Sequence, residues 1–372
     1  MPLPSVVKIG FLVNPVAGMG GAVGLKGTDG LEVQSEAVKR GASMVAPQRA
    51  VAALRSLELT GLEVEILTCS GYMGEKELQE ASLPSAIVHG AAERSTREDT
   101  VLAAKKFVDA SADLIVFAGG DGTARDVLEA VDRRVPIIGV PAGVKMHSAV
   151  FLNRPEDLGT LVMAFSREPA TRTADVMDID EDLFREGVLS ARLYGVATVP
   201  DDNVRLQSGK MSYQSGSADD EAAEIGQYVA DSMESGVIYI IGPGSTTAAI
   251  AEALGVAKTL LGVDVVKDRR VLKSDVSEKD LLESLEGCTK AKIIVSPIGA
   301  QGFFFGRGNQ QISGTVIDRV GVENVIVVST PTKVKDTPLL RVDTGDDDLD
   351  RSLRGRIRVI TGYKRRKLVD VR

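Results

Sequence analysis

The stretch Leu114–Thr123, with the sequence LIVFAGGDGT, runs from an apolar segment directly into a glycine-rich turn. Five consecutive apolar residues are typical of a strand that is buried on both faces. Val127, Leu128 and Val131 then recur on one helical face, so the pattern predicts strand, turn and helix in succession. Glycines at such a turn can adopt positive φ and leave no Cβ in the way of a phosphate. The first turn of the helix adds backbone amides and positive dipole. We therefore interpret Gly119, Gly120, Gly122 and Thr123 as a phosphate-binding loop, with a simple tight turn as the alternative.

Asp121 is an unexpected residue for a loop that binds only an anion. A carboxylate beside phosphates is useful if it holds Mg²⁺ or accepts a proton from an attacking hydroxyl. Asp121 is therefore our candidate for both a catalytic residue and a metal ligand.

The first part of the chain alternates short apolar runs with helical patterns. The predicted strands are Val6–Val13, Val64–Leu67, Ala86–Val88, Leu114–Phe117 and Val135–Val140. The clearest helix is Thr96–Ala110, with Asp99 in its first turn. This alternation predicts an α/β nucleotide-binding domain with a Rossmann-like parallel sheet over residues 1–170.

The second part of the chain, residues 171–372, also reads as α/β. Predicted strands are Ala174–Asp180, Leu189–Val199, Val237–Ile241, Ala291–Val295, Val325–Val328 and Arg356–Ile360, and predicted helices are Ala222–Met233 and Ser245–Leu254. Residues 201–220 are polar and predict an exposed loop or lid. We expect a second, mixed α/β domain that forms the other wall of a cleft and whose C-terminal segment returns to the first domain.

Two further glycine turns follow predicted strands. Gly18, Gly20 and Gly21 lie behind the first strand with Lys26 nearby, which suits a loop that covers phosphates, although a surface loop is the alternative. Gly244, Ser245, Thr246 and Thr247 open a predicted helix and are candidate substrate ligands, with simple helix capping as the alternative.

Polar side chains at other predicted strand or loop ends complete the candidate site. His147 could orient the acceptor or act as a base and Lys145 could neutralise phosphate, because ligands of α/β sheets bind at strand ends. Arg307 could bind a phosphate, and the amides of Asn309 and Gln310 could read a base or sugar edge. For both groups, hydrogen-bonded structural roles are the alternative.

Composition limits the function classes. The net charge of −8 argues against a nucleic-acid surface. Two distant cysteines imply no disulfide framework or zinc ribbon, and no apolar run is long enough for a membrane span. We expect a cytoplasmic homo-oligomer without nucleic-acid or membrane partners. The basic cluster at 364–367 and the acidic run at 346–348 are interpreted as a solvated tail and a solvated turn.

The GGDGT motif resembles the signature of the superfamily that joins NAD kinases with diacylglycerol and sphingosine kinases. The opening segment Ile9–Gly18, which contains N-P-x-x-G, is similar to the strand and turn that precede the motif in that superfamily. The whole pattern is most similar to the predicted ATP- or polyphosphate-dependent NAD kinases. Further similar segments are 18–21, 24–30, 139–148 and 306–311.

The resemblance implies a role for each matching residue. It places the nucleotide phosphates on Gly119, Gly120, Gly122 and Thr123, and it implies that Asp121 activates the acceptor hydroxyl or organises the metal. It also places Asn14, Pro15 and Gly18 beside the nucleotide. The sequence departs from typical NAD kinases in two ways: no Asn is followed by Glu or Asp, and the second half reads as α/β rather than all-β.

The function we expect is a small-molecule kinase. It would transfer a phosphoryl group from ATP or polyphosphate, with Mg²⁺, to a hydroxyl of a small molecule, and NAD is the first candidate acceptor. Another hydroxylated metabolite, or a non-catalytic nucleotide sensor, is the alternative. A nicotinamide-dependent oxidoreductase lacks support because no complete G-x-G-x-x-G follows the first strand.

Overall fold

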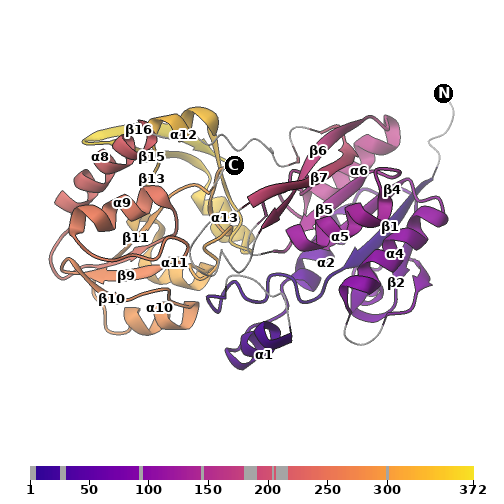
Figure 1. The fold of residues 1–372 in the computed structure, drawn as a ribbon, viewed down its shortest axis with the longest axis horizontal. Coiled ribbons are helices and arrows are strands. Elements are labelled where there is room, and N and C mark those ends of the chain that lie inside the picture. Colours follow the sequence, from indigo (N-terminus) through magenta and orange to yellow (C-terminus); the bar gives the residue numbers. More distant parts are fainter. Residues whose placement is uncertain are drawn as a thin grey trace. The chain divides into compact units, whose positions relative to one another are not determined.

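The chain folds into two compact units in the computed structural model (Figure 1). The structure describes residues 6–25, 31–91, 95–143, 146–179, 191–202, 205–206, 217–298 and 301–372. Unit 1 comprises residues 1–19 and 27–209, and unit 2 comprises residues 20–26 and 210–372. Lys26, Lys145 and most of the predicted 201–220 loop lie outside the described residues.

Within its described residues, unit 1 is built on a parallel sheet of five strands in the order β3-β2-β1-β4-β5. The strands are β1 (Val7–Val13), β2 (Val64–Cys69), β3 (Ala86–His89), β4 (Leu114–Gly119) and β5 (Ile137–Pro141). Every residue of β4 and β5 is buried, as expected for parallel strands that are covered on both faces. The predicted Rossmann-like parallel sheet is confirmed.

Helices cover this sheet in two packed pairs, α2 with α6 and α4 with α5. The helices of unit 1 are α1 (Leu31–Lys39), α2 (Ala46–Glu58), α3 (Glu75–Glu80), α4 (Arg97–Asp109), α5 (Asp121–Val131) and α6 (Asp157–Arg167), with a 3₁₀ turn η1 (Gly71–Met73). The predicted helix at 96–110 is confirmed as α4. It begins at a capping box in which Thr96 and Asp99 each accept a hydrogen bond from the other's backbone amide.

An antiparallel hairpin of β6 (Thr171–Ile179) and β7 (Ala191–Pro200) completes unit 1. It packs against β5 and α5, and its residues Val176, Ala197 and Val199 join the core of the first sheet. The compact unit therefore extends to residue 209, beyond the predicted boundary at 170. The reason is that this hairpin buries its apolar face on unit 1.

The described part of unit 2 contains a mixed nine-stranded sheet in the order β10-β9-β8-β11-β13-β15-β16-β14-β12. Its strands are β8 (Ile238–Ile241), β9 (Asp264–Lys267), β10 (Arg270–Lys273), β11 (Ala291–Val295), β12 (Phe303–Phe305), β13 (Val325–Val328), β14 (Leu339–Val342), β15 (Gly355–Gly362) and β16 (Arg365–Val371). Its helices are α8 (Ser217–Asp231), α9 (Ser245–Leu254), α10 (Glu278–Leu285), α11 (Gly314–Val320), α12 (Pro331–Asp336) and α13 (Asp347–Leu353), with a 3₁₀ turn η3 (Val322–Asn324). The second mixed α/β domain is therefore confirmed.

Alternate residues along the central strands of unit 2 enter two different cores. Ile240, Ile293 and Val327 face one core with residues of α10 and α11. Ile241, Ile294 and Val328 face the other core with residues of α8 and α9. The central strands β8, β11, β13 and β15 run parallel, so their carboxyl ends lie along one edge of the sheet.

The C-terminal strands belong to the sheet of unit 2, where β15 and β16 form an antiparallel hairpin. The basic cluster is not a tail: Lys364 forms the turn with φ of 56°, and Arg365–Lys367 begin β16 with exposed side chains. Buried Val369 and Val371 hold this strand in the sheet. The acidic run begins α13, where Asp346 caps the helix.

None of the described helices combines the length and the hydropathy that a membrane span requires.

Candidate functional site

The unit 1 site lies where β1 and β4 are neighbours in the sheet. The strand order reverses there, and open α/β sheets bind ligands beyond the carboxyl ends of the strands at this point. Asn14 follows β1 directly, and its backbone amide donates to Ala118 O at 2.9 Å. Its Nδ2 donates to Thr123 Oγ1 at 3.0 Å, and its Oδ1 accepts from the Val16 amide at 3.3 Å. Asn14 therefore ties the N-P-x-x-G turn to the GGDGT loop.

The glycines of the GGDGT loop act through close packing. Gly119 and Gly120 are absent from the residues with positive φ, so the positive φ predicted for this turn is wrong at both positions. A Cβ on Gly119 would overlap the Thr123 side chain, and a Cβ on Gly120 would lie 3.2 Å from Gly143 Cα. Only glycine lets these backbones approach so closely.

The N-terminus of α5 can receive an anion. The helix begins at Asp121, with Gly120 as an N-cap that supplies no side-chain hydrogen bond. The first backbone amides of an α-helix have no partner within the helix, and its N-terminus carries partial positive charge. Gly122 and Thr123 lie in this first turn, as the sequence predicted.

Asp121 is buried and holds the loop that follows β5. Its Oδ2 accepts from the His147 amide at 2.7 Å, and its Oδ1 accepts from the Ser148 amide at 3.0 Å. Burial raises the pKa of the Asp121 carboxyl, while the nearby His147 and these hydrogen bonds act in the opposite direction. A carboxyl with a raised pKa accepts a proton more readily than an ordinary aspartate.

The loops after β1, β4 and β5 meet at this point. The amides of Ala142 and Gly143 donate to Gly119 O at 3.0 and 3.1 Å. Gly18 has φ of 81°, and a Cβ there would overlap Ala142 O. The structure thus brings Asn14, Gly18, the GGDGT loop and His147 into one cluster, of which half-buried His147 is the most exposed catalytic candidate.

Arg49 is a residue of this cluster that the sequence analysis missed. It lies on α2, and its Nε donates to Pro141 O at the end of β5. A guanidinium beside a phosphate-binding loop can neutralise negative charge. No motif marks Arg49, because it reaches the loop from a helix that lies about ninety residues earlier in the chain.

The glycine-rich segment that begins in unit 1 continues into unit 2. Gly20 and Gly21 belong to unit 2, where a Cβ on Gly21 would lie 3.1 Å from Gln310 Cβ. Ala22 O accepts from the amide of Glu278, the first residue of α10, at 2.9 Å. This segment is therefore packed on unit 2, and Gln310 lies beside it.

The Gly244–Thr247 turn follows β8 at the carboxyl edge of the unit 2 sheet. Thr247 Oγ1 donates to Gly242 O at 2.7 Å and to Gly244 O at 2.9 Å, so this hydroxyl serves the turn itself. Thr246 is also buried, whereas Ser245 is exposed. α9 begins at Ser245 without a side-chain cap.

Lys333 lies at the same edge and was also missed. It follows β13 in α12, and its Nζ lies 3.5 Å from Oγ of Ser296, the residue after β11. Burial lowers the pKa of the Lys333 ammonium to about 8. The sequence does contain a pattern that could have indicated Lys333. The apolar run Val325–Val328 is followed by Ser-Thr-Pro, and polar residues that directly follow a buried strand are candidates for ligand binding, as they were at the GGDGT loop.

Arg307 and Asn309 have structural partners. Buried Arg307 pairs with Asp343, with 3.0 Å between Nη2 and Oδ2, and its guanidinium stacks over Phe303. Asn309 Nδ2 donates to Phe304 O at 2.9 Å, and its Oδ1 accepts from the Gly306 amide at 3.0 Å. We therefore do not include these two side chains in the proposed site.

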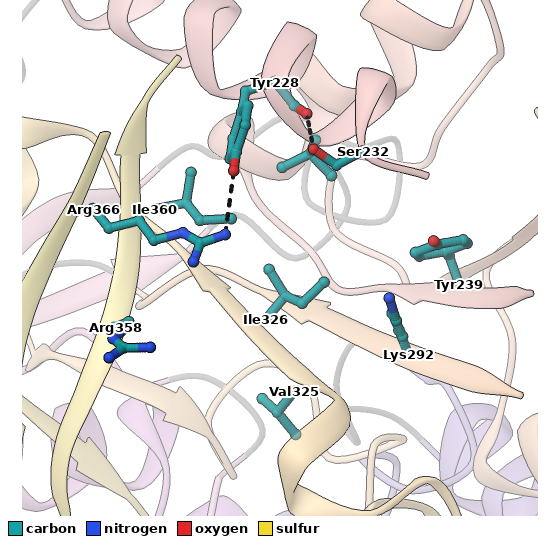
Figure 2. A pocket seen from close by; sticks show the side chains of 10 residues that line it. Tyr228, Ser232, Tyr239, Lys292, Val325, Ile326, Arg358, Ile360 and Arg366 are labelled. Carbon is teal, nitrogen blue, oxygen red and sulfur yellow. Dashed lines mark hydrogen bonds between the residues drawn. The ribbon is translucent and has the colours of Figure 1, made fainter. Parts of the chain in front are cut away.

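A pocket of about 230 Å³ lies elsewhere on unit 2 (Figure 2). Tyr228, Tyr239, Lys292, Arg358 and Arg366 are among its lining residues. Two of its cations have partners, because Lys292 pairs with Glu234 and Arg366 Nη2 donates to Tyr228 OH at 3.2 Å. It is not lined by any residue of the GGDGT loop or the Gly244–Thr247 turn.

Residues that could hold a metal ion are few in the described chain. No group of three or more His, Cys, Asp or Glu side chains is arranged there to bind a metal. A Mg²⁺ at Asp121 would therefore take its other ligands from phosphate oxygens and water, as Mg²⁺ commonly does beside nucleotides.

The chain shows distant likeness to the following solved structures. The chain is similar to "A putative diacylglycerol kinase from Bacillus anthracis str. Sterne", with 16% identity, a TM-score of 0.22, and coverage of 47% of this chain and 45% of that chain. It is also similar to a structure titled as a "putative UDP-N-acetylglucosamine 2-epimerase from Listeria monocytogenes", with 9% identity, a TM-score of 0.25, and coverage of 92% and 75%. The match to the Bacillus protein spans less than half of either chain. Comparison with curated proteins finds no match.

Both halves of the chain match family models. The family described as ATP-NAD kinase N-terminal domain matches residues 9–169, which contain the β1 turn, the GGDGT loop and His147. The family described as ATP-NAD kinase C-terminal domain matches residues 234–371, which contain the unit 2 sheet. The two matches together cover most of the chain, and the chain therefore belongs to the NAD kinase family.

Proposed function

We propose that this protein is a kinase that transfers a phosphoryl group from ATP or polyphosphate to a hydroxyl of a small molecule. NAD, which would give NADP, is the first acceptor to test. The observation that carries the proposal is the cluster at the sheet's switch point. This cluster contains the amino end of α5, the hydrogen bond from Asn14 to Thr123, and the buried carboxylate of Asp121.

The donor phosphates would bind the first amides of α5. These amides and the helix dipole favour negative charge, and the Gly119 and Gly120 backbones leave room for close approach. Arg49, which donates to Pro141 O beside this loop, could add positive charge. Asp121 is the residue that would hold Mg²⁺, and the ion would supply positive charge that neutralises the transferring phosphoryl group.

Asp121 would accept the proton of the acceptor hydroxyl. The hydroxyl oxygen attacks the terminal phosphorus, the bond from that phosphorus to the bridging oxygen of the donor breaks, and the proton passes to the Asp121 carboxylate. The products are the phosphate ester and ADP, or polyphosphate shortened by one unit. His147, whose backbone amide donates to Asp121, would orient the acceptor.

The test is a phosphoryl-transfer screen with purified full-length protein and Mg²⁺. ATP and polyphosphate serve as donors, and NAD, nucleosides, sugar phosphates, polyols and acetoin-like alcohols serve as acceptors. We expect one acceptor class to form a phosphate ester at a rate well above the rate without enzyme. Absence of transfer to every acceptor with either donor would rule out the kinase.

A non-catalytic nucleotide sensor is the second candidate. It is favoured by one observation, namely that both carboxylate oxygens of Asp121 already accept hydrogen bonds from backbone amides. A sensor would bind ADP and catalyse no transfer. Calorimetric binding of ADP, measured beside the transfer screen, separates the two candidates.

A further inference from the structure

A cation without an acidic partner lies at the carboxyl edge of the unit 2 sheet. Within the described residues, the contact found for the Lys333 ammonium is the Ser296 hydroxyl at 3.5 Å, and no carboxylate forms an ion pair with it. Glu221 of α8 contacts the same helix, but it accepts from the amide and hydroxyl of Thr332. Lys333 is half-buried, and a charge that is partly removed from water without a counter-charge is costly, so an anion that binds here would offset part of that cost.

A second polar group at this edge also lacks a partner. Ser329 follows β13, its residue is 1% exposed, and its Oγ has no hydrogen-bond partner in the described structure. Ser296 and Ser329 follow neighbouring parallel strands, so both lie where those strands end. A buried hydroxyl without a partner is unusual in native proteins. Together with Lys333, it points to a ligand that accepts hydrogen bonds.

The amino end of α9 lies at the same edge. β8 is the neighbour of β11, and the amide of Gly242 at the start of the turn donates to Ile294 O at 2.8 Å. α9 has ten residues and begins without a side-chain cap. The groups gathered here are an ammonium, two hydroxyls and helix-terminal amides, and all of them can donate to a phosphate.

We infer that Lys333, Ser296, Ser329 and the first turn of α9 form an anion site within unit 2 that binds a phosphate group of a small-molecule ligand. This inference goes beyond the proposed kinase function. The ligand would be a compound that carries a phosphate, such as a nucleotide, a dinucleotide or a sugar phosphate. A neutral polyol or a simple alcohol would leave the ammonium without a counter-charge.

The direct test measures binding of inorganic pyrophosphate to the full chain by calorimetry. Lys333→Met should weaken the binding at least tenfold, and the milder Ser296→Ala should weaken it several-fold. Lys335→Met removes an exposed charge from the same helix and should change the affinity less than twofold. Any pyrophosphate bound by the GGDGT loop is retained in all three variants, and thermal melts verify that each variant is folded.

The basic pocket of Figure 2 is the rival location, because Arg358 lines it and is exposed. Arg358→Gln should leave pyrophosphate binding within twofold of wild type. If Arg358→Gln causes the loss instead, or if folded Lys333→Met binds like wild type, the anion site is not at the strand ends and our inference is wrong.

The pyrophosphate titration and the transfer screen have separate outcomes. If no acceptor turns over, the proposed kinase function fails, and the titration still decides whether the anion site exists. If folded Lys333→Met binds pyrophosphate like wild type, the anion site fails and the kinase stands.

Discussion

At the scale of single residues, Asp121 combines two properties that a catalytic carboxylate needs. Its position is set by the amides of His147 and Ser148, and burial raises its pKa. The Ser148 side chain also forms a hydrogen bond with the Asp121 carboxylate. The same bonds join the GGDGT loop to the loop after β5, so Asp121 also has a structural role.

Asp121→Asn should lower kcat by about 10²–10⁴-fold, the range typical of loss of a general base. The affinity for ADP should change by only a few-fold, because the α5 amides remain. Steady-state kinetics and ADP calorimetry measure the two effects. Asp126→Asn is the matched control, since Asp126 is a buried carboxylate of the same helix that pairs with Arg97. A kcat within threefold of wild type in folded Asp121→Asn would remove Asp121 from the chemistry.

Lys333→Met should raise Tm at pH 7 in a buffer without phosphate. The Lys333 pKa falls from 10.5 in the unfolded chain to about 8 in the folded protein. Between these values the unfolded chain binds more protons, so wild-type stability rises with pH across this window. The gain in folding stability of Lys333→Met over wild type is therefore largest below about pH 8 and decreases as the pH rises toward 10.5. Lys335→Met, on the same helix and exposed, should show no such pH dependence in differential scanning calorimetry.

At the scale of elements, the unit 1 site depends on how tightly α5 begins against β4. Gly119 is the last residue of β4, and its backbone lies directly against the side chain of Thr123 in the first turn of α5. The amides of Ala142 and Gly143 close the opposite side by donating to Gly119 O. This packing fixes the direction of the helix amides toward the switch point.

Gly119→Ala should destabilise the protein by about 1–3 kcal/mol, the usual cost of overpacking, because its Cβ would overlap Thr123. It should also weaken ADP binding by displacing the start of α5. Urea unfolding and ADP calorimetry measure both effects. Gly90→Ala is the matched control: Gly90 follows β3, and no atom lies within 4 Å of its added Cβ. Equal stability of the two variants would contradict the packing argument.

At the scale of the whole molecule, the chain forms two compact units, and a short N-terminal segment belongs to the second. The described residues 20–25 are part of unit 2, whereas the chain before and after this segment belongs to unit 1 until residue 209. The β6–β7 hairpin belongs to unit 1 because Val176, Ala197 and Val199 are buried in its core.

A fragment of residues 1–209 should therefore melt at a higher temperature than a fragment of residues 1–170. The shorter fragment loses the hairpin and exposes the apolar surfaces of β5 and α5 that the hairpin covers. Circular dichroism melts of the two fragments measure the difference. Both fragments contain residues 20–26 without their unit 2 partners, so that loss is common to both. Equal melting temperatures would place the domain boundary at the sequence-based position instead.

The sequence by itself determined the local features of this protein. Apolar runs of strand length predicted β1, β4, β8, β11 and β13, because burial on both faces leaves a continuous apolar pattern. The GGDGT motif was found because its strand, turn and helix are contiguous in the chain. The helix at 96–110 was predicted from its helical spacing and from Asp99 in its first turn, and the structure adds that Thr96 and Asp99 form a capping box there.

Only the tertiary structure decided which distant residues meet. Nothing near Asp121 in the sequence indicates that its carboxylate accepts from His147 and Ser148, or that Arg49 reaches the end of β5. The burial of Lys333 beside Ser296 depends on the pairing of β11 with β13. The basic cluster at 364–367 was interpreted as a tail because it is charged and lies near the C-terminus, whereas its place in the sheet depends on β15 and β14 on either side of β16. The local sequence pattern determines which face of each helix or strand is apolar. The order of the strands, and the contacts between distant residues that this order creates, depend on how all of these apolar faces are buried in one fold.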